Sequence, residues 1–307
     1  MKPSLQQHIE STLTYFELFS YPLTATEIHR FLNVVCSISD VEDQLVLMKK
    51  NGKVVCSEQG YYSRLHQPRW SVERDMGNKR AEKLLKLSSR FVRVIKRFPF
   101  VEAIAISGSL SKYYADKDAD IDYFIITTTN RLWIARTLLH LYKKLTFLRG
   151  HQHYYCMNYF IDQSALEIGD KNIYTAIELV TLLPVYNQEA ILKLKHQNGW
   201  FAEFLPNENL NQDERFLLPM NNGFFKSFLE SFINVLWAKR LNQFFMRLTD
   251  RKWRAKWKKK SFPMDTYNQA LHTSLHVSKN HPDDFQFQVL NALKNNKPLS
   301  KPPTWTT

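Results

Sequence analysis

The sequence is short of glycine and cysteine and has no long apolar run. Only 8 of the 307 residues are glycine, and neither G-x-G-x-x-G nor G-x-x-x-x-G-K occurs, which argues against Rossmann-type and P-loop nucleotide sites. Three cysteines, Cys36, Cys56 and Cys156, lie far apart and predict neither a disulfide framework nor a zinc-ligand pair. No run approaches the roughly 20 apolar residues of a membrane span, and the N-terminus lacks a signal-peptide pattern. These absences predict a reducing, cytoplasmic protein.

The composition is that of a folded, basic protein. Hydrophobic residues make up 44% of the chain and aromatic residues 14%, so the chain can bury a large core divided among two or three domains. The formal net charge of +13 favours polyanionic partners, whether nucleic acid, nucleotide phosphates or an anionic membrane surface.

Residues 1–68 have the pattern of three short helices followed by a hairpin. Thr24 and Glu27 form a capping-box pattern at the second helix, and the third is expected to begin at Ser39 or Asp40 and to end at Gly52. This order resembles a winged-helix domain. Because acidic residues occupy the first turn of the third helix, we favour a protein-contact or intramolecular role over specific DNA binding. Residues 69–98 are expected to form one long linker helix with a solvated basic face.

The stretch "SGSLSKYYADKDADIDYFII", residues 107–126, places four aspartates at alternate positions between two apolar runs. The runs 101–106 and 121–127 have strand character, and Gly108 allows a sharp turn between the first strand and a helix start. Asp120 and Asp122 are two residues apart in an extended chain, so that both carboxylates project from one face and can share a divalent cation. An EF-hand loop is rejected, because Ile121 and Thr127 stand where that loop needs glycine and glutamate.

Gly108-Ser109, ten intervening residues and Asp120-Ile121-Asp122 resemble the catalytic signature of the DNA polymerase beta-like nucleotidyltransferase superfamily. The resemblance covers roughly residues 100–170. It implies that Gly108 and Ser109 hold the phosphates of a nucleoside triphosphate such as ATP, and that Asp120 and Asp122 bind Mg²⁺ or Mn²⁺. It further implies transfer of a nucleotidyl group to a hydroxyl acceptor, which the sequence does not identify.

The chain departs from that family pattern at two points. The family's third carboxylate is expected on a later strand, where Asn158 occupies the equivalent position; Asp162 is our first choice for this role and Glu167 another. The second departure is the segment "LSKYYADKD" after Gly108-Ser109, where many relatives have small residues and a glycine. Lys112 in this segment could reach a phosphate, although a surface ion pair is the commoner role of such a lysine. The histidines at 151 and 153 have no third metal ligand nearby in the sequence, and we leave both out of the site.

The rest of the chain reads as mainly helical. Residues 130–145 and 223–248 have helical spacing, and the segment from 173 onward continues the helical pattern. The run "RKWRAKWKKK" at 251–260 interleaves Trp253 and Trp257 with basic residues. It suits a phosphate backbone or an anionic membrane surface, or equally a solvated cationic face with two docked tryptophans.

These patterns predict an α+β protein with a central nucleotidyltransferase-fold mixed sheet, flanking helices, an N-terminal winged helix and a C-terminal helical domain. After the linker helix, the expected parts are the catalytic domain at 99–185, the helical domain at 186–298 and a loose tail at 299–307. The leading function is Mg²⁺-dependent nucleotidyl transfer. The alternatives are a catalytically degenerate nucleotide-binding or regulatory module, which Asn158 favours, and a winged-helix nucleic-acid-binding regulator.

Overall fold

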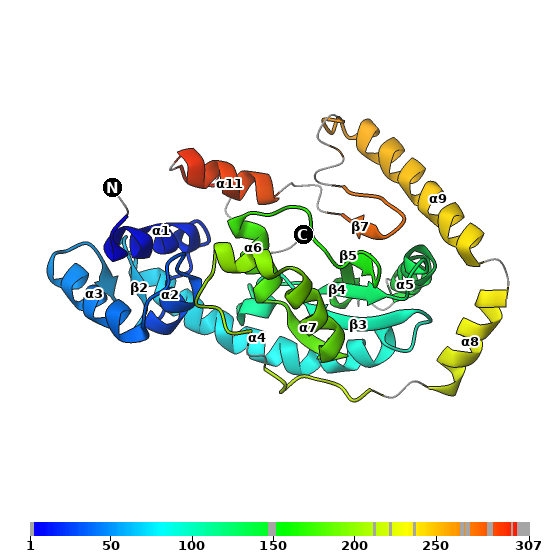
Figure 1. The fold of residues 1–307 in the computed structure, drawn as a ribbon, viewed down its shortest axis with the longest axis horizontal. Coiled ribbons are helices and arrows are strands. Elements are labelled where there is room, and N and C mark those ends of the chain that lie inside the picture. Colours follow the sequence, from blue (N-terminus) through cyan, green and yellow to red (C-terminus); the bar gives the residue numbers. More distant parts are fainter. Residues whose placement is uncertain are drawn as a thin grey trace.

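The structure is a computed structural model that describes residues 3–146, 152–210, 213–220, 223–235, 238–264, 267, 271–280, 285–295 and 297–299. It is an α+β protein with a five-stranded mixed sheet flanked by helices, as the sequence predicts at this level (Figure 1). Among the described residues, no helix is both long and apolar enough to cross a membrane.

The chain begins with three helices and a short hairpin. Their bounds are α1 (Leu5–Glu17), α2 (Ala25–Phe31), α3 (Ile38–Lys50), β1 (Val55–Cys56) and β2 (Tyr62–Ser63). The predicted capping box of α2 is present, since Thr24 and Glu27 exchange side chain-to-backbone hydrogen bonds of 2.8 and 3.2 Å. The expected start of α3 was wrong: Ser37 is the N-cap, and Asp40 closes its capping box from the third helical position.

The long helix α4 (Pro68–Ile95) then passes beneath the sheet (Figure 1). Proline opens this helix, which is the position where its missing N–H costs nothing. The helix ends three residues earlier than the predicted bound at 98, and a turn leads to Pro99. The face of α4 that carries Leu85, Val92 and Ile95 is buried against the sheet.

The sheet has the strand order β6-β3-β4-β5-β7. Only β4 and β5 are parallel, and the other neighbours are antiparallel. Its strands are β3 (Val101–Ile106), β4 (Asp122–Thr127), β5 (Cys156–Asp162), β6 (Leu183–Tyr186) and β7 (Val277–Lys279). The edge strands β6 and β7 fall in segments predicted to be helical, so the last part of the chain contributes to the central sheet as well as to helices.

The two faces of the sheet are buried against different helices. On β4, Phe124 and Ile126 belong to one apolar cluster, whereas Tyr123 and Ile125 belong to the other. The second cluster includes α4 and α5 (Leu132–Thr146). The first cluster joins the sheet to α6 (Ile173–Val180), α7 (Gln188–Gln197), η4 (Gly199–Glu203) and α11 (Phe285–Asn295).

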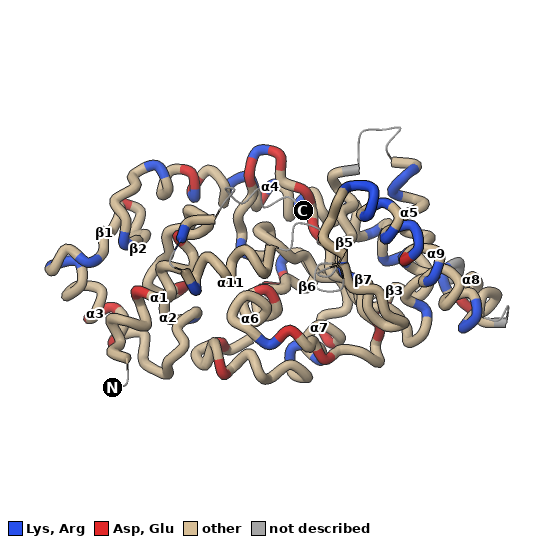
Figure 2. The backbone as a smooth tube through the Cα atoms, turned by 90° about the horizontal axis from the view of Figure 1, so that it is seen from above, with Lys and Arg blue, Asp and Glu red and all other residues tan. Residues whose placement is uncertain are grey.

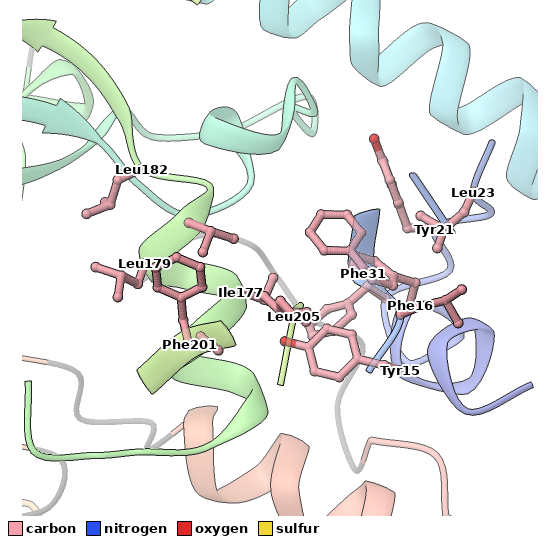
Figure 3. Packing of buried hydrophobic residues seen from close by; sticks show 14 of the residues in the cluster. Tyr15, Phe16, Tyr21, Leu23, Phe31, Ile177, Leu179, Leu182, Phe201 and Leu205 are labelled. Atoms are coloured by element: carbon pink, nitrogen blue, oxygen red, sulfur yellow. The ribbon is translucent and has the colours of Figure 1, made fainter. Parts of the chain in front are cut away.

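The first cluster also contains the core of the N-terminal helices. Figure 3 shows Tyr15, Phe16 and Phe31 packed close to Ile177 and Leu205, residues of α6 and of the segment after η4. The N-terminal helices therefore share one continuous apolar core with one face of the sheet.

The predicted single helix at 223–248 is two helices, α8 (Phe224–Val235) and α9 (Ala238–Lys259). The basic run lies in α9, where Lys and Arg gather along an outer face of the molecule (Figure 2). Trp253 and Trp257 pack on Tyr267 and Leu271, and the Arg136 guanidinium lies 4.7 Å from the Trp253 ring centre. Trp253 thus contacts α5, whereas Trp257 packs within a small apolar cluster formed by α9 and the segment that follows it. Of the predicted tail at 299–307, only residue 299 lies within the described part of the chain.

Candidate active site

The turn after β3 is built around one glycine. Gly108 has φ +65°, a backbone conformation that side chains disfavour, and a Cβ at this position would lie 3.0 Å from Oδ2 of Asp122. The backbone N–H of Ser107 donates a 3.0 Å hydrogen bond to the carbonyl oxygen of Asp122. The end of β3 and the start of β4 are thereby held in close contact, with the aspartate carboxylate directly against the glycine.

Asp122 is the first residue of β4, and its carboxylate is desolvated. The residue is 8% exposed, and no lysine, arginine or histidine within the described ranges forms an ion pair with it. Burial is the main cause that raises the pKa of Asp122 to about 7; a hydrogen bond with Cys156 lowers it, and the negative charges of Asp120 and Glu178 contribute to the rise. A buried carboxylate of this kind is destabilising when ionised unless a cation binds to it.

Asp120 lies just before the strand and is more exposed. Its Oδ1 is 2.7 Å from Nδ1 of His153, a residue of the 3₁₀ turn η3 (Gln152–Tyr154) that precedes β5. His153 was not predicted to belong to the site, but in the structure its imidazole contacts one of the two aspartates. The other histidine of the pair, at position 151, lies outside the described residues.

Asn158 of β5 lies beside Asp122. The sequence predicted it at the position equivalent to the family's third carboxylate. Its side-chain amide donates to Oδ1 of Asp122 at 3.4 Å and to Sγ of Cys156 at 3.0 Å. Asn158 is neutral and cannot act as a base, so it does not replace a third carboxylate chemically.

Asp162 does not join this group. In the parallel pair of β4 and β5, Cys156 is opposite Asp122, whereas Asp162 is opposite Thr127 at the other end of β4. Five residues of strand, roughly 16 Å, therefore separate Asp162 from the aspartate pair. The Asp162 carboxylate is fully buried and accepts hydrogen bonds from the backbone of Asn130 and from Ser164. The other candidate, Glu167, is exposed and pairs with Lys171.

Lys112 is neither exposed nor free to reach a ligand. Its ammonium group forms a 2.8 Å ion pair with Glu178 and a 3.1 Å hydrogen bond to the carbonyl oxygen of Gly108. The expected helix after the turn is only the three-residue 3₁₀ helix η1 (Leu110–Lys112). Ser109 is buried at its start, whereas Ser107 and Gly108 line the neighbouring cavity. Lys112 therefore stabilises the Gly108 turn through its hydrogen bond to the backbone carbonyl.

A cavity of about 140 Å³ opens beside Asp122. Ser107, Gly108 and Asn158 line it near the aspartate, and Glu178 of α6 lines it from the helical side. Sequence reasoning missed Glu178. A signal was present, because it is the single acidic residue in the otherwise apolar helix "IYTAIELV".

Mg²⁺ is the ion implied by the family resemblance, and the residues present suit it. Within the described part of the chain, no group of three or more His, Cys, Asp or Glu side chains is arranged to hold a metal. Mg²⁺ usually binds through one or two carboxylates together with phosphate oxygens and water, so two aspartates are sufficient. The residues that would hold the ion are Asp122, a buried carboxylate that forms no ion pair within the described ranges, and its neighbour Asp120.

Comparison with protein-family models, with curated proteins and with solved structures found no match to this chain.

Proposed function

We propose that this protein is a Mg²⁺-dependent nucleotidyltransferase that moves a nucleotidyl group from a nucleoside triphosphate to a hydroxyl acceptor. The observation that carries the proposal is the contact between the Gly108 turn, which has a positive φ, and the buried carboxylate of Asp122. A turn without a side chain lets phosphate approach the backbone closely, and the carboxylate beside it can bind the cation that accompanies the phosphate.

In the proposed reaction, the acceptor oxygen forms a bond to the α-phosphorus. The bond from that phosphorus to the oxygen bridging to the β-phosphate breaks, and its electron pair leaves with pyrophosphate. When bound, Mg²⁺ would neutralise the charge that develops on the phosphate oxygens. Asp120 and Asp122 hold the ion, and the Gly108 turn orients the triphosphate.

Glu178 is our choice for the acceptor of the hydroxyl proton. It lines the same cavity as Asp122, and the two lie close enough that the charge of Glu178 raises the pKa of Asp122. The Lys112 ion pair fixes the position of its carboxylate. A positioned base contributes about 10²–10⁴-fold to rate, so a Glu178→Gln variant should still bind nucleotide and should transfer it more slowly by about that factor.

The test is incubation of the protein with each α-labelled nucleoside triphosphate, Mg²⁺ or Mn²⁺, and cell extract. Label carried onto an acceptor by the wild type, and not by the Asp120→Asn/Asp122→Asn variant, is the expected result. An Asp116→Asn/Asp118→Asn variant, changed in the neighbouring turn, is the matched control and should retain transfer. No transfer with any of the four nucleotides would contradict the proposal.

A second candidate function rests on the hydrogen bond from Asn158 to Asp122. If the family's third carboxylate is required, a neutral amide at this place leaves a module that binds Mg²⁺ and nucleotide without turnover. Nucleotide binding that depends on Asp122, in the absence of label transfer, would favour this candidate. The exposed Glu42 and Asp43 near the start of α3 would repel phosphates, and we do not extend the proposal to nucleic-acid recognition by this helix.

A further inference from the structure

The cavity beside Asp122 has mainly apolar walls supplied by both layers of the fold. Phe124 and Tyr159 line it from β4 and β5, with their rings 4.9 Å apart in an edge-to-face arrangement. On the helical side, Tyr174 of α6 and Phe285 of α11 form a second aromatic pair, with ring centres 6.2 Å apart. Leu179 and Leu182, from α6 and the residues after it, complete the apolar wall (Figure 3).

Apart from Asp122, the charged groups that line the cavity lie in pairs and leave these walls apolar. Glu178 is paired with Lys112 at 2.8 Å. Lys279 lies 3.2 Å from Asp170 and donates to the side chain of Gln286. A ligand with many hydrogen-bonding atoms would find few partners deep in such a cavity, and burying its polar groups there would be unfavourable.

The volume limits what the cavity can hold. A cavity of about 140 Å³ is close to the ~150 Å³ that accommodates benzene in a protein interior. The space matches one ring-sized apolar group. A purine or pyrimidine would bring polar edges against apolar walls, which is unfavourable. We therefore place the nucleotide at the Gly108 turn and outward from it.

The cavity is partly open to solvent, so its apolar walls contact water when no ligand is bound, and covering them is favourable. Here the cavity lies directly against the carboxylate to which we assign the chemistry. Aromatic and aliphatic walls with a few polar groups at one end are the usual make-up of a small-molecule site.

We propose that this cavity binds the apolar ring of a small hydroxylated molecule, with the hydroxyl directed toward Asp122. The role of this molecule rests on the proposed function: if the protein transfers a nucleotidyl group, the molecule bound in the cavity is its acceptor. The acceptor that we assign is then a small aromatic or alicyclic alcohol. A nucleic acid strand, or a tyrosine side chain of a protein, which also joins a ring to a hydroxyl, is an outcome that the test distinguishes.

The test uses benzyl alcohol, which joins one ring to one hydroxyl, and glycerol, which has hydroxyls and no ring. Saturation-transfer NMR and titration should show that the full-length protein binds benzyl alcohol and not glycerol. Leu179→Trp fills the cavity and should weaken benzyl alcohol binding at least tenfold. Ile168→Phe, a smaller change in the cavity wall, serves if the tryptophan variant does not fold. Leu141→Trp, on the exposed face of α5, is the matched control and should bind like the wild type.

Failure of this inference is distinguishable from failure of the proposed function. Lack of benzyl alcohol binding, or binding that both cavity-filling variants leave unchanged, would overturn the ring site. Asp122→Asn should keep the ring site and lose Mg²⁺-dependent nucleotide binding. Ring binding without label transfer under any condition would contradict the proposed function while supporting the ring site. Label recovered only on nucleic acid or protein would overturn the assignment of the acceptor.

Discussion

Two residues, Gly108 and Asp122, determine the geometry at the centre of the site. The glycine accepts a positive φ, and the absence of its side chain leaves room for the aspartate carboxylate. The two requirements are separate, since Gly52 also has a positive φ but would have no atom within 4 Å of an added Cβ. Gly52 therefore provides an internal reference for the cost of backbone strain alone.

Replacing Gly108 with alanine should destabilise the protein more than replacing Gly52. Left-handed backbone costs a residue with a side chain roughly 1–2 kcal/mol, and we expect about this loss for Gly52→Ala. Gly108→Ala adds the contact with Asp122 and should lose about 1 kcal/mol more in the free energy of unfolding. Chemical denaturation of both variants measures the difference. Equal losses would mean that the close approach to Asp122 has no energetic consequence.

The burial of Asp122 predicts a pH dependence of stability in the metal-free protein. The ordinary pKa of 3.8 is raised to about 7 in the folded state. Between these values the folded state binds more protons than the unfolded state, so the protein loses stability as the pH rises from about 4 to 7. Asp122→Asn should remove this loss and raise the free energy of unfolding at pH 8 by about 2–4 kcal/mol.

Denaturation curves of wild type and Asp122→Asn from pH 4 to pH 8 test this expectation. Asp118→Asn, which changes an exposed aspartate of the same stretch, is the control and should follow the wild type. A destabilised Asp122→Asn variant at pH 8 would show that the ionised carboxylate is favourable in the fold even without a cation.

Among the elements, helix α3 allows a direct test of where its N-terminal cap lies. The sequence expectation put its cap at Ser39 or Asp40, whereas the Ser37 side chain accepts the hydrogen bond from the backbone N–H of Asp40. Ser37→Ala should therefore cost about 1 kcal/mol of stability. Ser39→Ala, two residues away and inside the helix, should stay within about 0.5 kcal/mol of the wild type. Thermal denaturation of the two variants measures these losses of stability. A larger loss for Ser39→Ala than for Ser37→Ala would place the cap at Ser39.

The elements that sequence patterns predicted correctly are those with strong local signals. The strands around the Asp120–Asp122 stretch and the helices near the N-terminus have apolar spacing and caps that act over a few residues. The edge strands β6 and β7 have four and three residues, too few for a periodic signal. β6 also contains Pro184, which is tolerated because this strand lies at the edge of the sheet, where β3 is its one neighbouring strand among those described.

The same limit applies to the site. Four of the site residues come together because the neighbouring strands β3, β4 and β5 meet at the same end of the sheet, which local patterns can predict. These residues are Gly108, Asp120, Asp122 and Asn158. Glu178 is marked in the sequence as the single acidic residue of its helix, but it reaches the cavity through the packing of α6 on the sheet, which one sequence does not specify. Asp162 was predicted on the correct strand, but the register of β5 against β4 moves it to the opposite end.

For the molecule as a whole, Arg74 of α4 joins the N-terminal helices to the rest of the structure. Its buried guanidinium donates to the carbonyl oxygen of Pro22, pairs with Glu27 at 2.7 Å and lies 4.3 Å from the ring centre of Tyr21. Removing it leaves the Pro22 carbonyl without this donor and takes from Glu27 the guanidinium with which it pairs.

Arg74→Met should therefore lower the free energy of unfolding by about 2 kcal/mol, less than for a fully buried ion pair, because part of the Glu27 side chain remains in contact with solvent. Arg69→Met changes an exposed arginine of the same helix and should have little effect. Chemical denaturation of both variants measures this. A loss below about 1 kcal/mol for Arg74→Met would mean that the joint between the N-terminal helices and α4 depends on apolar packing alone.

The central claim for the whole molecule is that Asp120 and Asp122 hold a divalent cation together with nucleotide at the Gly108 turn. The most direct measurement is the EPR signal of free Mn²⁺ in solutions of fixed Mn²⁺ and nucleoside triphosphate, as the protein is titrated in. We expect the wild type to lower the signal and the Asp122→Asn variant to leave it close to the protein-free level. Equal loss of signal with both proteins would contradict the claim.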